Sequence, residues 1–287
     1  MKIKTVISII LSLLFAAFLF YLIFIEPKSL EVNRLTLHLD NCPQGLRGTK
    51  MVHLSDFHTR RFGEFERRVI EIVNSENPDF IFITGDFVQS DSKDSLRDFF
   101  RVVSLLKSKE GIFAVLGNWE HVYGIVEDDL ETRFLNSGAT LLVNDSRRIK
   151  INGASLLIAG TDDAAKSNNL DLDATLAKKD KKDFVILLSH SQQLLYQDRL
   201  KRLEREKIEL ILMGHTHGGQ VNIPLISDYI ISKALGEICV KYKAGLFPIE
   251  GGFLYVNRGI GTSILPMRFL SRPEVAIITL EQKDITN

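Results

Sequence analysis

Five short apolar runs in this chain each end on side chains that can bind a metal ion or a phosphate. Each run has about the length of a β-strand and is rich in β-branched and aromatic residues, which is typical of strands buried on both faces. The runs cover residues 51–55, 80–85, 112–117, 184–189 and 208–214, and the residues that follow them are Asp56 with His58, Asp86, Asn118, His190, and His215 with His217. In an open α/β sheet, ligands bind beyond the carboxyl ends of the strands. The pattern therefore predicts one metal site at one edge of a sheet.

These seven candidate ligands offer imidazole, carboxylate and amide groups and no thiolate. Such a mixture suits Mn, Fe or Zn better than Ca or Cu(I). Seven ligands are too many for one tetrahedral zinc, but they suit two divalent cations that share Asp86, since a carboxylate has two oxygens. Two cations ~3.5–4 Å apart hold a bridging hydroxide and clamp a phosphoryl group for in-line attack. We therefore predict a centre of two divalent metal ions, with Mn favoured and Fe or Zn as alternatives.

The composition excludes several other classes of protein. The chain has 287 residues, 45% of them hydrophobic, which is enough for one large domain or two small ones. The formal net charge is zero, so we expect no nucleic-acid partner, which would usually require a basic excess. Cys42 and Cys239 have no CxxC partner and predict two independent thiols rather than a disulfide framework or a zinc site. The oligomeric state is left open.

An uncharged, mostly apolar stretch covers Thr5–Ile25 near the N-terminus. Its length matches the ~20 residues that a helix needs to span a bilayer. A cleaved signal peptide is the alternative, but no small-x-small site follows the apolar run. We predict a single-pass membrane protein with an anchor at residues 1–27 and one domain at residues 28–287. Lys2 and Lys4 favour an N-terminus inside the cell, and Lys28 and Arg34 on the far side weaken that contrast.

Beyond the anchor, strand and helix patterns alternate and predict an α/β fold. An edge strand is expected at Val32–Leu39, and Asn152-Gly153 predicts a tight hairpin turn. Further strands are expected at residues 140–143, 148–151, 155–159, 253–256 and 274–280. Helices are expected at residues 65–75, 95–108, 126–137, 170–177 and 192–205, with an N-cap at Asp94-Ser95 for the second.

The ordered set of motifs resembles the calcineurin-like metallophosphoesterase superfamily from Lys50 to Leu280. The resemblance implies a four-layer α-β-β-α sandwich of two mixed sheets and hydrolysis of a phosphodiester or pyrophosphate by a metal-bridged hydroxide. It also implies a division of the ligands between the two metals. Asp56, His58, Asp86 and His217 would hold one metal, and Asp86, Asn118, His190 and His215 the other.

Two segments, residues 214–224 and 255–268, resemble a membrane-associated bacterial branch of that superfamily. The branch includes a UDP-2,3-diacylglucosamine pyrophosphatase of lipid A synthesis. The resemblance implies a phosphodiester or nucleotide-diphospho-lipid substrate at the bacterial inner (cytoplasmic) membrane, with Arg258 and Arg268 as substrate phosphate contacts. Lipid A synthesis requires a cytoplasmic active site, whereas Lys2 and Lys4 point the domain outward, so the side of the membrane is left open.

One residue departs from the family pattern. After Gly117-Asn118 the superfamily carries a histidine that protonates the leaving group, and this chain carries Trp119. Either His121 supplies the proton, with Glu120 orienting it, or the leaving group needs little protonation. General-acid assistance is worth ~10²–10⁴, so its absence would favour substrates with good leaving groups, such as pyrophosphates. The predicted catalytic residues are His121, Asn118 and Asp86.

Several residues have two interpretations at this stage. Arg60 and Arg61 either meet substrate phosphate or lie in a solvated loop, and Asp162 and Asp163 either support the site or form a turn. For the apolar stretch Pro224–Leu235, packing in the core is favoured over contact with the bilayer and acyl chains. His53 is expected in the core. The alternative functions are a broad phosphomonoesterase or phosphatase, and a non-catalytic metal-binding scaffold.

Overall fold

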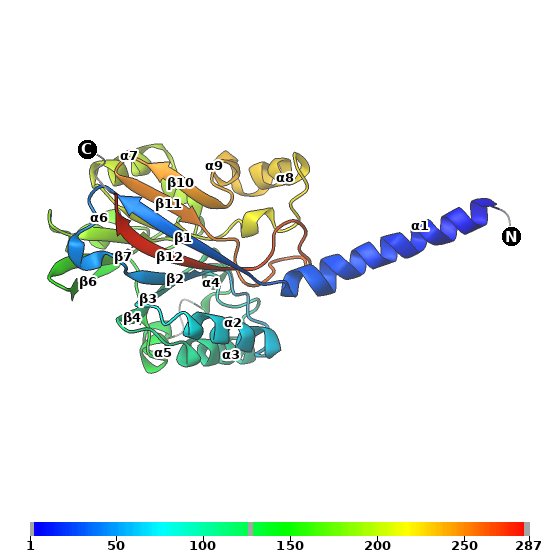
Figure 1. Ribbon diagram of the computed structural model, residues 1–287, viewed down its shortest axis with the longest axis horizontal. Helices are drawn as coiled ribbons and strands as arrows, with labels where there is room; N and C mark the ends of the chain where they lie inside the picture. Colours follow the sequence, from blue (N-terminus) through cyan, green and yellow to red (C-terminus); the bar gives the residue numbers. More distant parts are fainter. Residues whose placement is uncertain (1–2, 126–128, 284–287) are drawn as a thin grey trace.

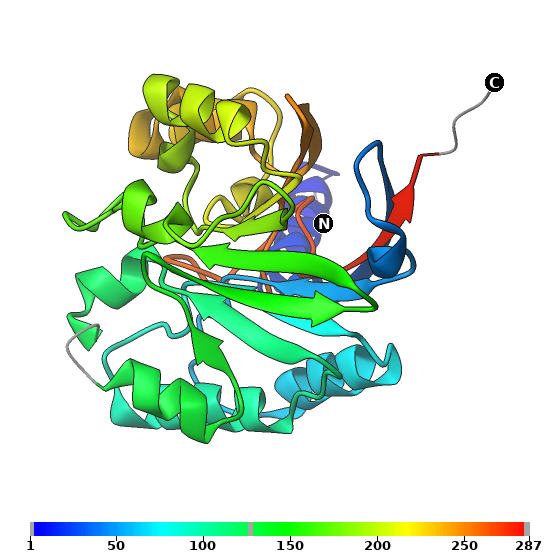
Figure 2. The ribbon, with the colours of Figure 1, turned by 90° about the vertical axis from the view of Figure 1, so that its left-hand side faces the viewer.

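A computed structural model describes residues 3–125 and 129–283, which form two six-stranded sheets packed face to face (Figures 1 and 2). The first sheet has the order β1-β12-β2-β3-β4-β5, with bounds Glu31–Leu39, Glu274–Gln282, Lys50–Leu54, Phe80–Thr84, Gly111–Val115 and Thr140–Leu141. The second has the order β10-β11-β9-β8-β7-β6, with bounds Gly245–Ile249, Gly252–Val256, Leu210–Met213, Phe184–Leu188, Ala154–Gly160 and Asp145–Ile151. Both sheets contain parallel and antiparallel pairs.

The apolar runs become strands because both of their faces are buried. In β3, Phe80 and Phe82 pack between the two sheets, whereas Ile81 and Ile83 pack against helices. This alternation follows from the period of two along a strand. The structure therefore explains why the run contains no polar residue before Thr84.

Helices cover the outer face of each sheet (Figure 1). The first sheet is covered by α2 (Glu64–Ser75), α3 (Lys93–Leu105) and α5 (Leu130–Asn136). The second is covered by α6 (Leu172–Leu176), α7 (Gln197–Arg205) and α9 (Glu237–Lys241), while α4 (Asn118–Val122) and α8 (Ile226–Leu235) lie at the end of the sandwich. The predicted four-layer α-β-β-α sandwich is confirmed.

Local expectations for the strands are largely met, but the strand expected at residues 140–143 ends at Leu141. The edge strand forms as β1, which pairs in parallel with β12. Asn152 and Gly153 join β6 to β7 with φ of 47° and 83°, as a type I′ hairpin turn requires. Cys42 and Cys239 are both free and buried, which confirms two independent thiols.

Two helix predictions are corrected. The helix expected at residues 95–108 runs from Lys93 to Leu105. Its N-cap is Ser92 rather than Asp94-Ser95, because the Ser92 hydroxyl accepts a hydrogen bond from Asp94 N. The stretch at residues 192–205 is not one helix. A 3₁₀ helix, Gln192–Leu195, is separated from α7 by Tyr196, whose ψ of 126° is extended.

Two further helices are shorter than expected. The helix at residues 170–177 is confined to α6, whose N-cap is Asp171. Of the helix at residues 126–137, residues 126–128 lie outside the described residues, and α5 begins after an N-cap at Asp129.

A long helical segment projects from the domain (Figure 1). It consists of α1 (Ile3–Phe20), a π-helical turn (Tyr21–Ile25) and a 3₁₀ turn (Glu26–Lys28). By length and composition it can cross a membrane. Its base is fixed to the domain, because Leu22 O accepts from Arg268 N at 3.0 Å and the buried Glu26 carboxylate accepts from Ser271 N at 2.9 Å.

Candidate metal centre

The seven candidate ligands meet where the carboxyl ends of the two sheets converge. The first sheet presents Asp56 and His58 after β2, Asp86 after β3 and Asn118 at the start of α4. The second sheet presents His190 after β8 and His215 and His217 after β9. Neither sheet alone carries the full set.

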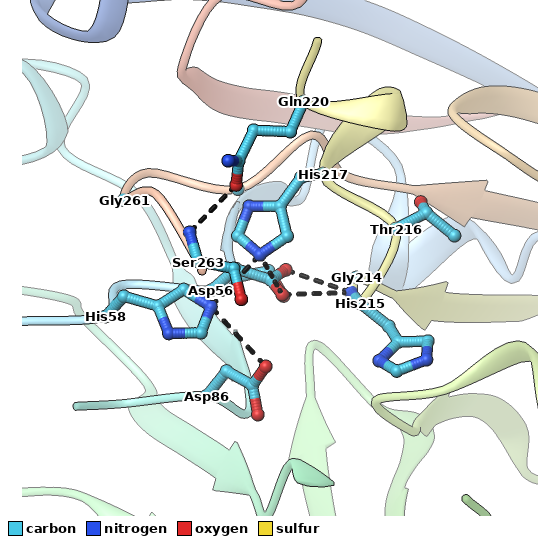
Figure 3. Close-up of polar contacts among 12 residues, drawn as sticks. Asp56, His58, Asp86, Gly214, His215, Thr216, His217, Gln220, Gly261 and Ser263 are labelled. Atoms are coloured by element: carbon cyan, nitrogen blue, oxygen red, sulfur yellow. Dashed lines mark hydrogen bonds and ion pairs between the residues drawn. The ribbon is translucent and has the colours of Figure 1, made fainter. Parts of the chain in front are cut away.

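Asp56, His58, Asp86 and His217 form the first group (Figure 3). Each offers a ligand atom, and these atoms all lie within 4.8 Å of one another. His58 Nε2 is 3.0 Å from His217 Nε2 and 3.5 Å from Asp86 Oδ2, and His217 Nε2 is 3.4 Å from Asp56 Oδ1. The group matches the set that the family resemblance implied for one metal.

Asp86, His190 and His215 form the second group, and Asn118 joins it. His190 Nε2 lies 3.3 Å from Asp86 Oδ2, 3.1 Å from Asn118 Oδ1 and 3.3 Å from His215 Nδ1. The other ring nitrogen, His190 Nδ1, is 2.7 Å from Thr84 O. That carbonyl fixes Nδ1 as a protonated nitrogen, so Nε2 is the nitrogen that faces the group. Burial alone would lower the pKa of His190, but Asp86 raises it well above its usual range, so a metal ion at Nε2 would displace a proton.

The donor set fits two divalent cations. Lone pairs of imidazole and carboxylate converge from several sides, an arrangement that a cation between them would stabilise. Asp86 Oδ2 faces both His58 and His190, as expected for a bridging carboxylate. His215 faces the second group through Nδ1, which lies 3.3 Å from His190 Nε2.

Burial keeps three of the histidines neutral and therefore able to donate lone pairs. It lowers the pKa of His58 to about 4 and that of His215 to about 3, and it lowers the pKa of His217 as well. Burial alone would raise the pKa of Asp86, but His190 and His58 lower this pKa to about 2. The shared ligand is therefore ionised.

The backbone at the ligands is strained. Asp56, His58, Asp86, His215 and His217 all have positive φ, between 43° and 74°, a region that non-glycine residues rarely adopt. Such strain persists where the surrounding structure imposes it and is concentrated at functional sites. The motif glycines make room for these turns. A Cβ at Gly214 would lie 1.8 Å from Ser55 Oγ and 2.3 Å from Asp56 Oδ2.

Glu120 supports the centre in a way that the sequence analysis missed. Its fully buried carboxylate accepts hydrogen bonds from Asp86 N at 2.9 Å, Phe87 N at 2.8 Å and Gly117 N at 2.7 Å. Glu120 therefore holds the loop that carries Asp86, and the expectation that it orients His121 is wrong. The contact joins residues about thirty apart in sequence, so no local signal indicates it.

His121 has a different partner. Its Nε2 lies 2.7 Å from Asp162 Oδ1, and this hydrogen bond raises the pKa of His121. The Trp119 ring packs edge-on against His58 with ring centroids 6.0 Å apart, and Trp119 N donates to Asp86 Oδ1 at 2.9 Å. The indole of Trp119 therefore lies beside the first group of candidate ligands. The imidazole of His121 is instead bound by Asp162, which follows β7.

Asp162 and Asp163 combine the two roles that the sequence left open. Asp163 Oδ2 accepts from Ala165 N and Lys166 N, which forms a turn. Its other oxygen accepts from the Ser191 hydroxyl at 2.6 Å, next to His190. His53 is fully buried beside Thr84, as expected of a core histidine.

The contacts of the two predicted phosphate-binding arginines do not support that role. Arg258 pairs with Glu274 at 3.1 Å and Glu31 at 3.2 Å. Arg268 is fully buried and donates to the carbonyls of Ser271 at 2.9 Å and Gly259 at 3.1 Å, with Nη2 3.4 Å from His217 Nδ1. Its guanidinium therefore braces the loop behind a candidate ligand.

A cavity of about 570 Å³ lies between the base of α1 and His58. Its cationic side chains are Lys28, Arg60, Arg61 and Arg68, and apolar wall is supplied by residues such as Phe57, Phe65 and Ile260. None of the four cations forms an ion pair within residues 3–125 and 129–283. Glu64 and Glu66 also line the cavity, so its four cations exceed its carboxylates by two. The cavity has a basic excess and an apolar wall, and it adjoins the candidate ligand His58.

Comparison with known proteins agrees with this geometry. The family model described as calcineurin-like phosphoesterase matches residues 49–219, a span that contains all seven candidate ligands. The chain is 32% identical over 269 residues to an uncharacterized metallophosphoesterase of Bacillus subtilis, YkuE, covering 91% of this chain and 89% of that protein.

Two further relatives carry informative names. Phosphodiesterase YaeI of Escherichia coli is 28% identical over 265 residues, which cover 91% of this chain and 92% of that protein. A transmembrane protein with metallophosphoesterase domain from Danio rerio is 27% identical over an alignment of 292 positions, and the alignment covers 97% of this chain and 63% of that protein.

Proposed function

We propose that this chain, which belongs to the calcineurin-like phosphoesterase family, is a binuclear phosphodiesterase or pyrophosphatase anchored in a membrane. The family and the relative named as a phosphodiesterase support the activity of a metal-dependent phosphoester hydrolase. The observation that carries this proposal is the position of Asp86 Oδ2 between the two groups of ligands, 3.5 Å from His58 and 3.3 Å from His190. Two cations would supply Lewis-acid polarisation of a phosphoryl oxygen and activation of water at neutral pH. Mn is favoured, with Fe or Zn as alternatives.

The protein's own residues position the reaction. Asp86 and Asn118 present oxygens from the first sheet, while His190 and His215 close the site from the second. Glu120 and Thr84 hold this set in place through backbone contacts. Such support from the surrounding hydrogen bonds preserves ligand geometry and basicity.

His121 is the candidate proton donor to the leaving group. Asp162 stabilises its protonated form, so His121 carries a proton at higher pH than a free imidazole does. Trp119 cannot protonate an oxygen, and its ring occupies space beside His58. The alternative is that no residue protonates the leaving group, in which case the site would favour substrates whose leaving groups need little protonation, such as pyrophosphates and aryl phosphodiesters.

The cavity beside His58 supports an amphiphilic anionic substrate. Three arginines and Lys28 suit phosphate groups, and the apolar wall suits a hydrocarbon portion. The cavity adjoins Pro27 and Lys28, where the anchor ends, so a lipid-linked phosphodiester or nucleotide-diphospho-lipid in the same membrane would reach it. UDP-2,3-diacylglucosamine is the candidate substrate of this class to test.

The proposed organisation is an anchor at residues 1–27 and a catalytic domain at residues 28–287. The helix Ile3–Lys28 and the relative named as a transmembrane protein support a single-pass membrane protein. The bacterial inner membrane is the proposed location.

The deciding experiment compares four substrates with full-length protein and Mn²⁺. They are UDP-2,3-diacylglucosamine, a bis-aryl phosphodiester, an aryl monophosphate and an alkyl monophosphate. We expect hydrolysis of the first two to exceed that of the monophosphates, and the Asp86→Ala and His215→Ala variants to be inactive. Equal turnover of alkyl monophosphates would refute the leaving-group argument, and activity that survives both substitutions would refute the metal mechanism.

A further inference from the structure

Seven large apolar side chains are exposed at the end of the domain from which α1 projects. They belong to the beginning of α8 and to the loop at residues 264–270, and we call them the apolar rim. Leu225 is 83% exposed and Ile264 is 78% exposed. The remaining members are Ile226, Tyr229, Ile230, Leu265 and Leu270. A helix packed in the core, which the sequence favoured for Pro224–Leu235, would have buried these residues, and α8 buries only Ser227 and Ile231.

The two parts of the rim form one surface, because hydrogen bonds join the segment before α8 to the loop that carries the other members. Asn222 N donates to Phe269 O at 2.7 Å, and Phe269 N donates to Gln220 O at 2.8 Å. The Gln220 side chain accepts from Ser263 N at 2.8 Å (Figure 3). It also donates to Leu265 O at 2.9 Å. Gln220 is three residues after His217, so the rim lies close to the metal ligands in the chain.

The contact between this surface and α1 sets its depth relative to the anchor. The Phe269 ring packs edge-on against Phe18 with centroids 5.3 Å apart, and Arg268 N donates to Leu22 O. Phe18 precedes Ile25, the end of the apolar stretch, by seven residues, or about 10 Å along a helix. If the apolar stretch spans a bilayer, residues packed on Phe18 lie below the level at which that stretch ends.

We propose that the apolar rim inserts into the membrane leaflet next to α1 and that the domain is docked on the bilayer as well as tethered to it. Monomeric proteins rarely expose a contiguous apolar surface of this kind without a partner. Helices that lie in the interface bury apolar side chains by ~5–10 Å, which agrees with the depth set by Phe18. Tyr229, with Lys233 5.7 Å from its ring, has the amphipathic character of residues at the headgroup level.

The cations of the cavity lie on the same end of the domain. Lys28 is at the base of the anchor, and Arg60, Arg61 and Arg68 share the cavity with it. With the rim inserted, these residues would lie near the anionic lipid headgroups, which attract juxtamembrane Lys and Arg. The occupant of the rim is therefore the lipid bilayer rather than a soluble protein or a second copy of the chain.

Depth-dependent quenching tests the proposal on full-length protein in vesicles of phosphatidylethanolamine and phosphatidylglycerol. A fluorophore is attached to a cysteine introduced by Tyr229→Cys or Ile264→Cys. The matched control is Leu135→Cys on α5, where the side chain is 70% exposed. Cys42 and Cys239 are buried, so labelling under native conditions selects the introduced thiol.

We expect nitroxides on the acyl chains to quench the labels at positions 229 and 264 several-fold more than the label at position 135, and aqueous iodide to show the opposite order. Strong iodide quenching at all three positions would place the rim in water and overturn the proposal. Protection of positions 229 and 264 from both quenchers would mean that protein covers the rim, which also overturns it. This readout needs no enzymatic activity, so it stands apart from the proposed function.

A second measurement uses the paired substitutions Leu225→Asp and Ile264→Asp in one variant. If the domain hydrolyses both a soluble aryl phosphodiester and a vesicle-embedded substrate, we expect at least a several-fold loss with the vesicle substrate alone. Equal rates with the vesicle substrate in the variant and the parent protein would contradict insertion of the rim.

Discussion

Replacement of Glu120 by glutamine tests whether the buried carboxylate holds Asp86 in place. Oε2 accepts from Asp86 N and Gly117 N, and Oε1 accepts from Phe87 N. Glutamine keeps one carbonyl oxygen, which can serve the first two donors, but its NH₂ group then faces Phe87 N–H. One buried donor therefore loses its acceptor.

The expected destabilisation follows from that count. An unsatisfied buried donor costs ~1–3 kcal/mol, so Glu120→Gln should lower the free energy of unfolding by about this amount. Glu120→Ala leaves three donors without an acceptor and should cost several kcal/mol, up to ~9 if the effects add. For a domain of this size each kcal/mol lowers Tm by roughly 2–4 °C. Burial raises the pKa of Glu120 to about 7, so the comparison belongs at about pH 8, where the carboxylate is ionised.

Calorimetry and Mn²⁺ titration of the same preparations provide the assay. Loss of a hydrogen-bond partner behind a ligand typically lowers metal affinity by ~10–100-fold, and we expect a change in this range for Glu120→Gln. The control is Glu71→Gln, because Glu71 is exposed on α2 and leaves no buried donor when changed. If Glu120→Gln matches this control in both Tm and Mn²⁺ affinity, Glu120 does not position Asp86.

Three further predictions concern the reaction. Asp86→Ala should reduce metal content from two ions per chain to one or none by elemental analysis, because Asp86 belongs to both ligand groups, whereas His215→Ala should spare the first group and leave about one. Asp162→Asn removes the hydrogen bond that raises the pKa of His121. If protonated His121 is the acid, activity declines as pH rises through this raised pKa, so the basic limb of the kcat profile should move to lower pH in the variant, and an unchanged profile would exclude that role. Trp119→His restores the superfamily's residue and should raise turnover of an alkyl monophosphate relative to a bis-aryl diester by at least about tenfold, given the ~10²–10⁴ range of general-acid assistance; no change in this ratio would contradict the leaving-group argument.

The parts of the fold that the sequence predicted are those in which neighbouring residues carry the signal. The run from Phe80 to Thr84 is apolar throughout because both faces of β3 are covered, and this continuity indicates a buried strand. The polar residue that ends such a run lies at the sheet edge whatever the rest of the chain does. The positions of the candidate ligands Asp56, Asp86 and His190 at the sheet edge were therefore predictable without any knowledge of their mutual distances.

The parts that the sequence did not predict depend on contacts between distant segments. Residues 192–205 have helical composition, but the chain turns at Tyr196 in the tertiary structure. Glu120 lies in the motif after β4, but its carboxylate accepts a hydrogen bond from Asp86 N in the loop after β3. Arg268 is of a residue type that often binds phosphate, yet its guanidinium donates to backbone carbonyls of nearby loop residues instead. The exposure of the apolar side chains of α8 likewise depends on where the surrounding loops lie, which the sequence of the helix does not indicate.

The two sheets each contribute part of the ligand set, and this division has a consequence for how the protein matures. The first sheet brings Asp56, His58, Asp86 and Asn118, and the second brings His190, His215 and His217. A partly folded chain in which the sheets have not yet docked holds neither group complete and should retain metal weakly. Metal acquisition would then come late in biogenesis, and the bound ions would act as cross-links that oppose separation of the two halves of the sandwich.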